Sequence, residues 1–315
     1  MSRPLVSAVI TAFNSERFLR ECLDGVLAQD YPELEVIVAD NASKDGTREI
    51  VRSYGSRIRL LDLGHSDLPG VTRNEGIRAA TGTYVALLDA DDAWYPEKVA
   101  RQVEFMEAHP GIPLSHTYVH VIDEQSKVLG VRHEGAIPST GSCIRPLLRH
   151  CFISTSAAMV RRTAVVDEGL WFPADPRTDR TGEDHLFFLL LARKHPVGFI
   201  GRVLAKYRRY PTSISSRFGW RIVPENMVLH ENVLTHPRYW RGAVPRSEPL
   251  AAFAEACLAN SMYWRDRRRF GRAAYFALRA LRRDPANGYA WVELAKACLK
   301  SLARRGAAPR LQSAP

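Results

Sequence analysis

The sequence predicts an α/β protein with a mostly parallel sheet flanked by helices, followed by an α-helical C-terminal region. In the first half, short apolar runs rich in β-branched residues alternate with helical patterns. Polar residues follow directly after three of these runs. Beyond about residue 224 helical spacing replaces the alternation. Open α/β sheets bind ligands at the carboxyl ends of their strands, so the polar residues should converge on one rim.

The first half of the chain predicts four strands and four helices in alternation. The expected strands are residues 5–11, 34–39, 58–61 and 84–88, each an apolar run bounded by polar or turn-forming residues. The expected helices are residues 14–29, 47–51, 71–80 and 96–108, and Pro96 suits the first turn of the last one. Further along, residues 114–122 and 154–160 are expected strands, and residues 183–194 are an expected helix.

Three segments with different organisation are expected along the chain. Residues 1–222 should form one α/β domain, and residues 223–303 a helical C-terminal region. Within this region the spacing of five residues resembles a tetratricopeptide helix hairpin: Ala273, Ala280, Pro285, Trp291 and Leu294. One hairpin cannot bury its own apolar face, so it should dock on the main domain or on a partner. Small and polar residues predict a disordered tail over residues 304–315.

The charge balance predicts an anionic partner. The chain of 315 residues has a formal net charge of +10 and an isoelectric point of about 9.6. Such a chain suits a nucleotide, a membrane surface or nucleic acid. The sequence has no zinc-finger spacing, RNA-binding signature or basic-aromatic stripe, so we expect no nucleic acid partner. Much of the basic excess lies between Arg265 and Arg283, which is either a solvated helix face or a peripheral contact with anionic lipid.

Cysteine usage and hydropathy predict a cytoplasmic protein. The five cysteines are scattered and form no CxxC pair, which is typical of reduced thiols. The N-terminal apolar run is short and lacks a cleavage site, so we interpret it as a strand and not as a signal peptide. No apolar stretch approaches the roughly 20 residues that cross a bilayer. Any membrane association should therefore be peripheral, at the inner face.

The motif Asp89-Ala90-Asp91-Asp92 follows a fully apolar run and predicts a metal site. Three carboxylates within four residues repel each other unless a cation or solvent offsets their charge. Mg²⁺ is typically held by one or two carboxylates together with substrate phosphates. Taken alone, the motif could equally be a solvated loop in which Asp92 starts the next helix. Its place after a buried strand favours the metal site.

Four further residues each permit two interpretations. Asp40 ends the second expected strand, where a carboxylate can accept from N3–H of uracil or simply cap a turn. Arg73 lies in an expected helix and would contact a pyrophosphate or lie on an exposed face. Glu183 and Asp184 begin another expected helix, where one can act as a general base or both can stabilise the helix N-terminus.

Four segments, in this order, resemble the family 2 glycosyltransferases: VSAVITAFNSERFLRECLDGVLAQD, VIVADNASKDGT, TRNEGIRAATGTYVALLDADD and GEDHLFF. The resemblance covers roughly residues 4 to 220, and the combination is highly specific. It implies the GT-A fold, a Rossmann-like nucleotide-diphospho-sugar transferase architecture, for residues 1–222. It also implies an inverting enzyme that uses a nucleotide-sugar donor and Mg²⁺ or Mn²⁺.

The resemblance also implies roles for individual residues. The nucleotide pocket would be lined by Thr11, Phe13, Asn14 and Glu16, with Asp40 at the base and Arg73 near the nucleotide. Asp91 would bind the metal that bridges the diphosphate, and Asp89 would contact the ribose side and the metal. Asp184, next to Glu183, would be the catalytic base. Arg208 would stabilise the leaving diphosphate within the cationic segment 207–210.

The implied reaction moves one sugar, from a UDP- or dTDP-sugar, to a hydroxyl of a glycan, lipid or protein by direct displacement. Such enzymes serve polysaccharide, glycolipid or glycoprotein biosynthesis. The chain has Tyr210 where the family often has a histidine, and it lacks the Gln-x-x-Arg-Trp motif of processive synthases, which favours single-sugar addition. The alternative is a catalytically silent nucleotide-sugar-binding or adaptor protein on the same fold.

Overall fold

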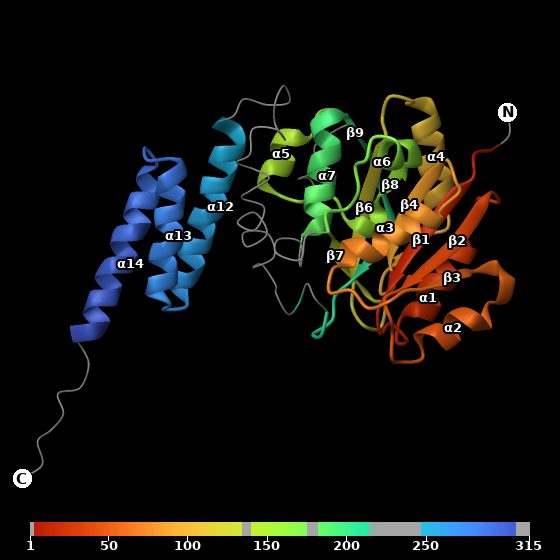
Figure 1. Ribbon diagram of the computed structural model, residues 1–315, viewed down its shortest axis with the longest axis horizontal. Coiled ribbons are helices and arrows are strands. Elements are labelled where there is room, and N and C mark those ends of the chain that lie inside the picture. The colour runs from red at the N-terminus through yellow and green to blue at the C-terminus, as the bar shows by residue number, and fades with distance from the viewer. Residues whose placement is uncertain (1–2, 134–139, 175–181, 214–215, 217–246, 307–315) are drawn as a thin grey trace, which may run out of the picture. The chain divides into compact units, whose positions relative to one another are not determined.

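The computed structural model describes residues 3–133, 140–174, 182–213, 216 and 247–306 (Figure 1). The chain divides into two compact units, Met1–Gly219 and Trp220–Pro315. The domain boundary expected near residue 222 lies outside the described residues. The expected tail begins at residue 304, but the last helix continues to Gly306. The first three residues of that segment are therefore helical, and residues 307–315 are outside the described range.

The first half of the sheet is the predicted parallel arrangement. Its strands are β1 (Val6–Ala12), β2 (Leu34–Asp40), β3 (Arg59–Asp62) and β4 (Tyr84–Asp89). They lie in the order β3-β2-β1-β4, and every neighbouring pair is parallel. The strands form here because their residues are mostly β-branched or small and their side chains are buried. Each strand matches its prediction to within one residue at either end.

Helices cover both faces of this parallel region. Alternate residues of β1, such as Ala8 and Ile10, share a buried cluster with α1 (Leu19–Leu27) and α4 (Lys98–Ala108). On the opposite face, α3 (Pro69–Ala79) packs so closely that a Cβ at Gly76 would lie 2.4 Å from Cγ1 of Val9. Glycine is therefore required at this contact. The short helix α2 (Thr47–Ser53) and the 3-10 turn η1 (Gly55–Arg57) connect β2 to β3.

The second half of the sheet is mixed. It continues β4-β8-β6-β9-β5, with β7 pairing the C-terminal end of β6. The strands are β5 (Ala93–Trp94), β6 (Leu114–Ile122), β7 (Val128–Val131), β8 (Met159–Arg161) and β9 (Val197–Arg208). Strand β8 is antiparallel to both β4 and β6, and β9 is parallel to β6 and antiparallel to β5. The sheet is thus parallel on one side and mixed on the other.

Two predictions in this half need correction. Residues 154–160 were expected to be one strand, but they contain the 3-10 turn η2 (Thr155–Ala157) before β8. Strand β9 ends at Arg208, so the cationic segment 207–210 begins within a strand. The helix α7 (Glu183–Lys194) has the predicted bounds. The remaining helices of this unit are α5 (Ile144–Arg149) and α6 (Arg162–Val166).

The described part of the C-terminal unit consists of three helices that lie side by side: α12 (Ser247–Asp266), α13 (Phe270–Arg283) and α14 (Gly288–Gly306) (Figure 1). Small residues of α13, including Ala273 and Ala277, are fully buried, which allows close approach of its neighbours. The hydroxyl of Ser261 donates a 2.8 Å hydrogen bond to the carbonyl of Ala273, and this bond joins α12 to α13. The tetratricopeptide likeness stays a prediction. Among the described residues, no helix combines the length and the apolar character needed to cross a bilayer.

Candidate functional site

The strand register gathers the predicted polar residues at one rim. Thr11 pairs with Asp89, and Ala12 pairs with Asp40, so the ends of three parallel strands coincide. The Thr11 hydroxyl donates a 3.0 Å hydrogen bond to Oδ1 of Asp89. The expected convergence of side chains from β1, β2 and β4 is therefore present. The loops that follow these strands form the candidate site.

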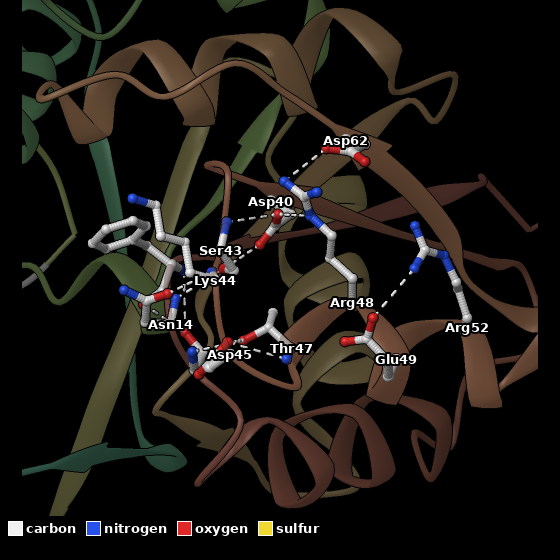
Figure 2. A network of polar contacts seen from close by, with 12 residues as sticks. Asn14, Asp40, Ser43, Lys44, Asp45, Thr47, Arg48, Glu49, Arg52 and Asp62 are labelled. Carbon is white, nitrogen blue, oxygen red and sulfur yellow. Dashed lines mark hydrogen bonds and ion pairs between the residues drawn. The ribbon is translucent and has the colours of Figure 1, made fainter.

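The loops that follow β1 and β2 are tied together by reciprocal hydrogen bonds (Figure 2). The amide of Asn14 donates to Oγ of Ser43 at 2.8 Å, and the amide of Lys44 donates back to Oδ1 of Asn14 at 2.9 Å. Asn14 has a φ of 48°, a left-handed conformation that asparagine tolerates better than most residues. This residue therefore shapes the rim through its backbone as well as its amide.

Glu16 completes the connection between these two loops. Its amide donates to Oδ2 of Asp45 at 3.0 Å, and its carboxylate accepts from the amide of Gly46 at 2.7 Å. Phe13, in contrast, is 49% exposed, and its ring centroid lies 5.3 Å from that of His65. Of the residues predicted to line a nucleotide pocket, Asn14 and Glu16 fix the loops, and Phe13 presents an open aromatic face.

Asp40 is completely buried at the centre of this network (Figure 2). Its carboxylate accepts from the amide of Ser43 at 3.0 Å, from the Ser43 hydroxyl and from Nε of Arg48 at 2.6 Å. Arg48 also pairs with Asp62 at 2.8 Å. A carboxylate offers about four acceptor positions, and three are taken here. Because Asp40 is completely buried, a base could reach the remaining position only if the residues that cover it moved, and this role of Asp40 stays a prediction.

Arg73 joins the motif after β4 to the start of α7. Its side chain is buried, with Nη2 2.7 Å from Oδ1 of Asp89 and Nη1 paired with the Glu183 carboxylate. Burial lowers the pKa of Arg73, but the negative charges of Asp89 and Glu183 outweigh it and raise that pKa. Burial raises the pKa of Glu183 to about 7 although Arg73 opposes the shift. Glu183 is therefore a positioning residue in this arrangement, not an exposed acid or base.

Asp91 is the carboxylate of the motif best suited to a metal. Burial and the charge of Asp89 raise the pKa of Asp91 to about 6. The Tyr210 hydroxyl donates a 3.0 Å hydrogen bond to Oδ2 of Asp91. Within the described part of the chain, no group of three or more His, Cys, Asp or Glu side chains is arranged to hold a metal ion by itself. Two carboxylates with room for phosphate oxygens fit the donor set that Mg²⁺ prefers.

Asp92 and Arg208 hold the loop that contains Asp91 in place. The amide of Arg208 donates to Oδ1 of Asp92 at 2.8 Å, and the Ser156 hydroxyl donates to the other oxygen. Nε of Arg208 donates to the Asp91 carbonyl at 2.8 Å, and Nη2 pairs with Glu21. The Arg208 side chain is fully buried. Arg208 is therefore bonded to several protein groups, and its expected contact with a leaving diphosphate stays a prediction.

Asp184 differs from its neighbours because its side chain is only half-buried, whereas Glu183 and His185 are buried. Its Oδ2 accepts a 3.4 Å hydrogen bond from the Thr155 hydroxyl, and its Oδ1 accepts from the amide of His185 at 2.7 Å. An accessible carboxylate with weak partners on one oxygen is chemically suited to accept a proton. The contributions of Thr155 and Ser156 were not predicted, because a short polar turn carries no signal of the loops that it meets.

Comparison with known proteins relates the chain to one protein family. The model of "Glycosyl transferase family 2" matches residues 7–170, which is more than half of the chain. An uncharacterised glycosyltransferase of Rickettsia conorii is 30% identical over 205 residues, 64% of this chain and 32% of that protein. A putative teichuronic acid biosynthesis glycosyltransferase, TuaG of Bacillus subtilis, is 37% identical over 107 residues, 33% of this chain and 42% of that protein. The chain thus spans less than half the length of these relatives.

A third relative and two solved structures extend the comparison. The Escherichia coli UDP-Glc:alpha-D-GlcNAc-diphosphoundecaprenol beta-1,3-glucosyltransferase WfaP is 26% identical over 226 residues, 71% of this chain and 85% of that enzyme. S. aureus TarS 1-349 in complex with UDP-GlcNAc superposes with a TM-score of 0.66 at 18% identity, over 97% of this chain and 93% of TarS.

The mannosyltransferase PcManGT of Pyrobaculum calidifontis, in complex with GDP-Man and Mn²⁺, gives a TM-score of 0.57 at 20% identity, over 98% of this chain and 77% of that one. At these identities both structures support the GT-A fold alone. The family match rests instead on the sequence of the sheet and its rim, where the ordered motifs lie. The chain belongs to glycosyl transferase family 2.

Proposed function

We propose that the chain transfers one sugar from a nucleoside-diphosphate sugar to an acceptor hydroxyl, with inversion at the anomeric carbon. The observation that carries the proposal is the Arg73 bridge, which pairs with Asp89 on one side and Glu183 on the other. This bridge links the loop that carries Asp89 and Asp91 to the start of α7, which carries the half-buried Asp184. A displacement reaction needs this fixed spacing between leaving group and base.

The donor in this proposal is a UDP- or dTDP-sugar. Phe13 supplies an exposed ring on which a planar base can stack, and Asp40 lies at the end of the neighbouring strand. The solved TarS complex contains UDP-GlcNAc, and WfaP is named for a UDP-Glc donor. These names favour a uridine nucleotide over GDP, the nucleotide of the PcManGT complex.

Mg²⁺ or Mn²⁺ would be held by Asp91 and Asp89 together with the donor diphosphate. When bound, the ion neutralises charge on the diphosphate. Tyr210 orients the Asp91 carboxylate, and Arg208 fixes the loop backbone through the Asp91 carbonyl. Both residues act on the site through Asp91.

Asp184 is the general base in this mechanism. Its half-buried carboxylate takes the proton from the acceptor hydroxyl as the oxygen attacks the anomeric carbon. The bond to the new oxygen forms on one face of the sugar while the bond to the diphosphate oxygen breaks on the other. The nucleoside diphosphate leaves with the electron pair of the broken bond, and the attack from the opposite face inverts the anomeric carbon.

The decisive experiment measures donor turnover with a panel of nucleotide sugars and Mn²⁺, on the wild-type chain, Asp184→Asn and Asp91→Asn. Asp184→Asn should lower turnover by about 10²- to 10⁴-fold with donor affinity retained, because it removes only the proton acceptor. Asp91→Asn should instead weaken metal-dependent donor binding in calorimetry. Asp167→Asn, an exposed aspartate in the same unit, is the matched control and should behave as wild type.

Full turnover by Asp184→Asn would contradict the assignment of the base. Donor binding without turnover on any acceptor or on water would favour the alternative, a silent nucleotide-sugar-binding or adaptor protein. Nucleic acid binding that survives saturating donor would oppose the proposal altogether.

We also propose a cytoplasmic protein that contacts the inner membrane face through α13. Tyr275, Leu278 and Arg282 follow each other at helical spacing on this helix, and all three are exposed. Exposed aromatic and arginine side chains on one stripe suit an anionic lipid surface better than a solvated face. Co-sedimentation with vesicles of anionic lipid, compared with neutral vesicles, tests this contact. Equal binding to both vesicles, or none, would oppose it.

A further inference from the structure

A chain of hydrogen bonds joins three basic side chains on the side of the fold that carries Asp184. Arg132 and His133 follow β7, and His150 follows α5. Nε of Arg132 lies 3.0 Å from Nε2 of His133, and Nδ1 of His133 lies 3.2 Å from Nε2 of His150. The two imidazole rings meet edge to face at 4.6 Å between centroids. We call these three residues the Arg132 cluster.

The direction of these hydrogen bonds follows from arginine chemistry. A guanidinium only donates, so Nε2 of His133 must accept and carries no proton. A neutral His133 is then protonated on Nδ1 and donates to Nε2 of His150. His150 in turn carries its proton on Nδ1, the far end of the chain. Three donors in series thus lead to one imidazole N–H that has no acceptor among the described residues.

Among the residues that the structure describes, none of the three members of the cluster forms an ion pair with a carboxylate. Burial, with the positive charge of Arg132, lowers the pKa of His133 to about 4 and lowers that of His150. The guanidinium is held in place by the Tyr207 ring, 4.8 Å from its central carbon. Preformed donors without a local anion fit a ligand that brings the negative charge.

The position of the cluster connects it to the proposed base. Nη1 of Arg132 lies 3.4 Å from the Ser154 hydroxyl, and the next residue, Thr155, donates to Asp184 at 3.4 Å. The charges of Arg132 and Asp184 both act on the buried thiol of Cys151, so both groups lie near it. A ligand on the cluster would therefore have its neighbouring hydroxyl close to Asp184.

We propose that Arg132 and His150, which His133 links by hydrogen bonds, bind a phosphate group of the acceptor substrate. The inference rests on the proposed transferase function, since Asp184 defines the acceptor side of the site. Charge-assisted hydrogen bonds from guanidinium and imidazole to phosphate oxygens are short and strong, and a phosphate offers several acceptors at once. The acceptor class is then a phosphate ester, either a sugar on a lipid diphosphate or a unit of a phosphodiester polymer.

The test follows the imidazole resonances of the full chain by NMR in saturating UDP and Mg²⁺, which occupy the donor site. Geranyl diphosphate and a glycerol phosphodiester are added as separate probes of the two sources. Variants His133→Asn and His150→Asn assign the resonances. A bound phosphate should shift both resonances. It should also raise the pKa values of His133 and His150, because its negative charge stabilises the protonated imidazoles and opposes the effect of Arg132.

Arg132→Gln should weaken binding of the preferred probe by about tenfold or more, because it removes a charge-assisted contact. Arg101→Gln, an exposed arginine on α4, should leave that affinity unchanged. Arg132→Lys, which keeps the charge but loses the guanidinium fork, should give an intermediate affinity and guards against a folding defect. Preference for one probe identifies the source of the phosphate.

Two results would overturn the inference: neither probe shifts His133 or His150, or Arg132→Gln binds as tightly as Arg101→Gln. The proposed function fails separately, by the absence of UDP binding in the same samples. In that event the phosphate titration is run without UDP, and its outcome still decides the role of the cluster.

Discussion

The hydroxyl of Tyr210 lies 3.0 Å from Oδ2 of Asp91 and donates a hydrogen bond to it. The Tyr210 ring packs against Phe18, with 5.0 Å between centroids, which fixes the hydroxyl. Burial and the neighbouring negative charge of Asp91 raise the pKa of Tyr210, so it remains a donor across the physiological range. Tyr210 thus orients the carboxylate that is proposed to bind the metal. It occupies the position at which the family often has a histidine.

Tyr210→Phe should weaken the apparent affinity for Mn²⁺ by about 10- to 100-fold, because groups that orient a metal ligand typically contribute this much. The measurement is donor turnover as a function of Mn²⁺ concentration. Tyr54→Phe is the matched control, since Tyr54 donates a 2.8 Å hydrogen bond to Asp24 away from the rim. An unchanged Mn²⁺ dependence in Tyr210→Phe would mean that this hydroxyl does not support the metal ligand.

Arg208→Met should destabilise the first unit by about 3–5 kcal/mol, because buried acceptors would lose a charged partner. The acceptors include the carbonyls of Asp91 and Asp123. Urea denaturation measures the change. Arg17→Met is the control: Arg17 also lies over the Phe18 ring, but it is 56% exposed and pairs only with Glu124. If Arg208→Met kept wild-type stability and lost only turnover, the leaving-group role would be supported.

Ala42→Gly should stabilise the chain by about 1 kcal/mol. A left-handed conformation costs an L-residue roughly 1–2 kcal/mol, and glycine removes this cost but loses part of the gain because its unfolded state has a higher entropy. Ala42 has a φ of 57° within the loop that follows β2. The free energy of unfolding in urea checks the sign. Ala100→Gly in α4 should have the opposite effect, because glycine weakens a helix interior. Destabilisation by Ala42→Gly would show that the methyl group makes compensating contacts.

Lys98→Met should gain stability relative to wild type as the pH falls from 10 to 7. Lys98 is fully buried over the Trp94 ring and donates to Gln102, and burial holds the pKa of Lys98 well below its usual value. The unfolded chain therefore binds one more proton than the native chain between the native pKa and about 10.4. The wild type gains stability as pH rises through this window, and Lys98→Met lacks this gain.

Urea denaturation at pH 7 and pH 10 measures the Lys98 effect as a difference between wild type and variant. The exposed Lys127 provides the control Lys127→Met, whose difference from wild type should not change with pH. A Lys98→Met difference that is also independent of pH would show that Lys98 keeps its ordinary pKa in the folded chain.

The sequence predicts the parallel half of the sheet well because its strands are continuous buried apolar runs. Strand β9 escapes prediction because its side chains vary from buried to exposed within one strand. Gly198 and Gly201 also interrupt it, and a Cβ at Gly198 would collide with the Phe105 ring. Its strand character therefore depends on pairing with β6, which a local pattern does not contain.

The carboxylates of the site were predicted, but the partners that define their roles were not. Asp91 and Asp184 follow from the motifs, whereas Glu183 pairs with Arg73 and Arg208 with Glu21 only through long-range packing. The resemblance to the family supplies candidate positions, and the fold decides which side chains face the rim. Arg208, for example, is fully buried and bonded to the Asp91 carbonyl and Glu21, and its expected contact with the diphosphate stays a prediction.

The parallel pairing of β6 with β9, from Leu114 opposite Val197 to Ile122 opposite Arg208, has a kinetic consequence. The two strands are separated by most of the second half of the unit, so a large loop must close before their contacts form. Loop closure of this kind is slow, whereas the local β-α-β units of the first half can assemble early. The nucleotide side of the rim should therefore form first during folding. The loop that contains Asp91 gains its contacts with Arg208 and Tyr210 only when β9 docks, so a partly folded chain would have the ends of β1, β2 and β4 in place before this loop is fixed.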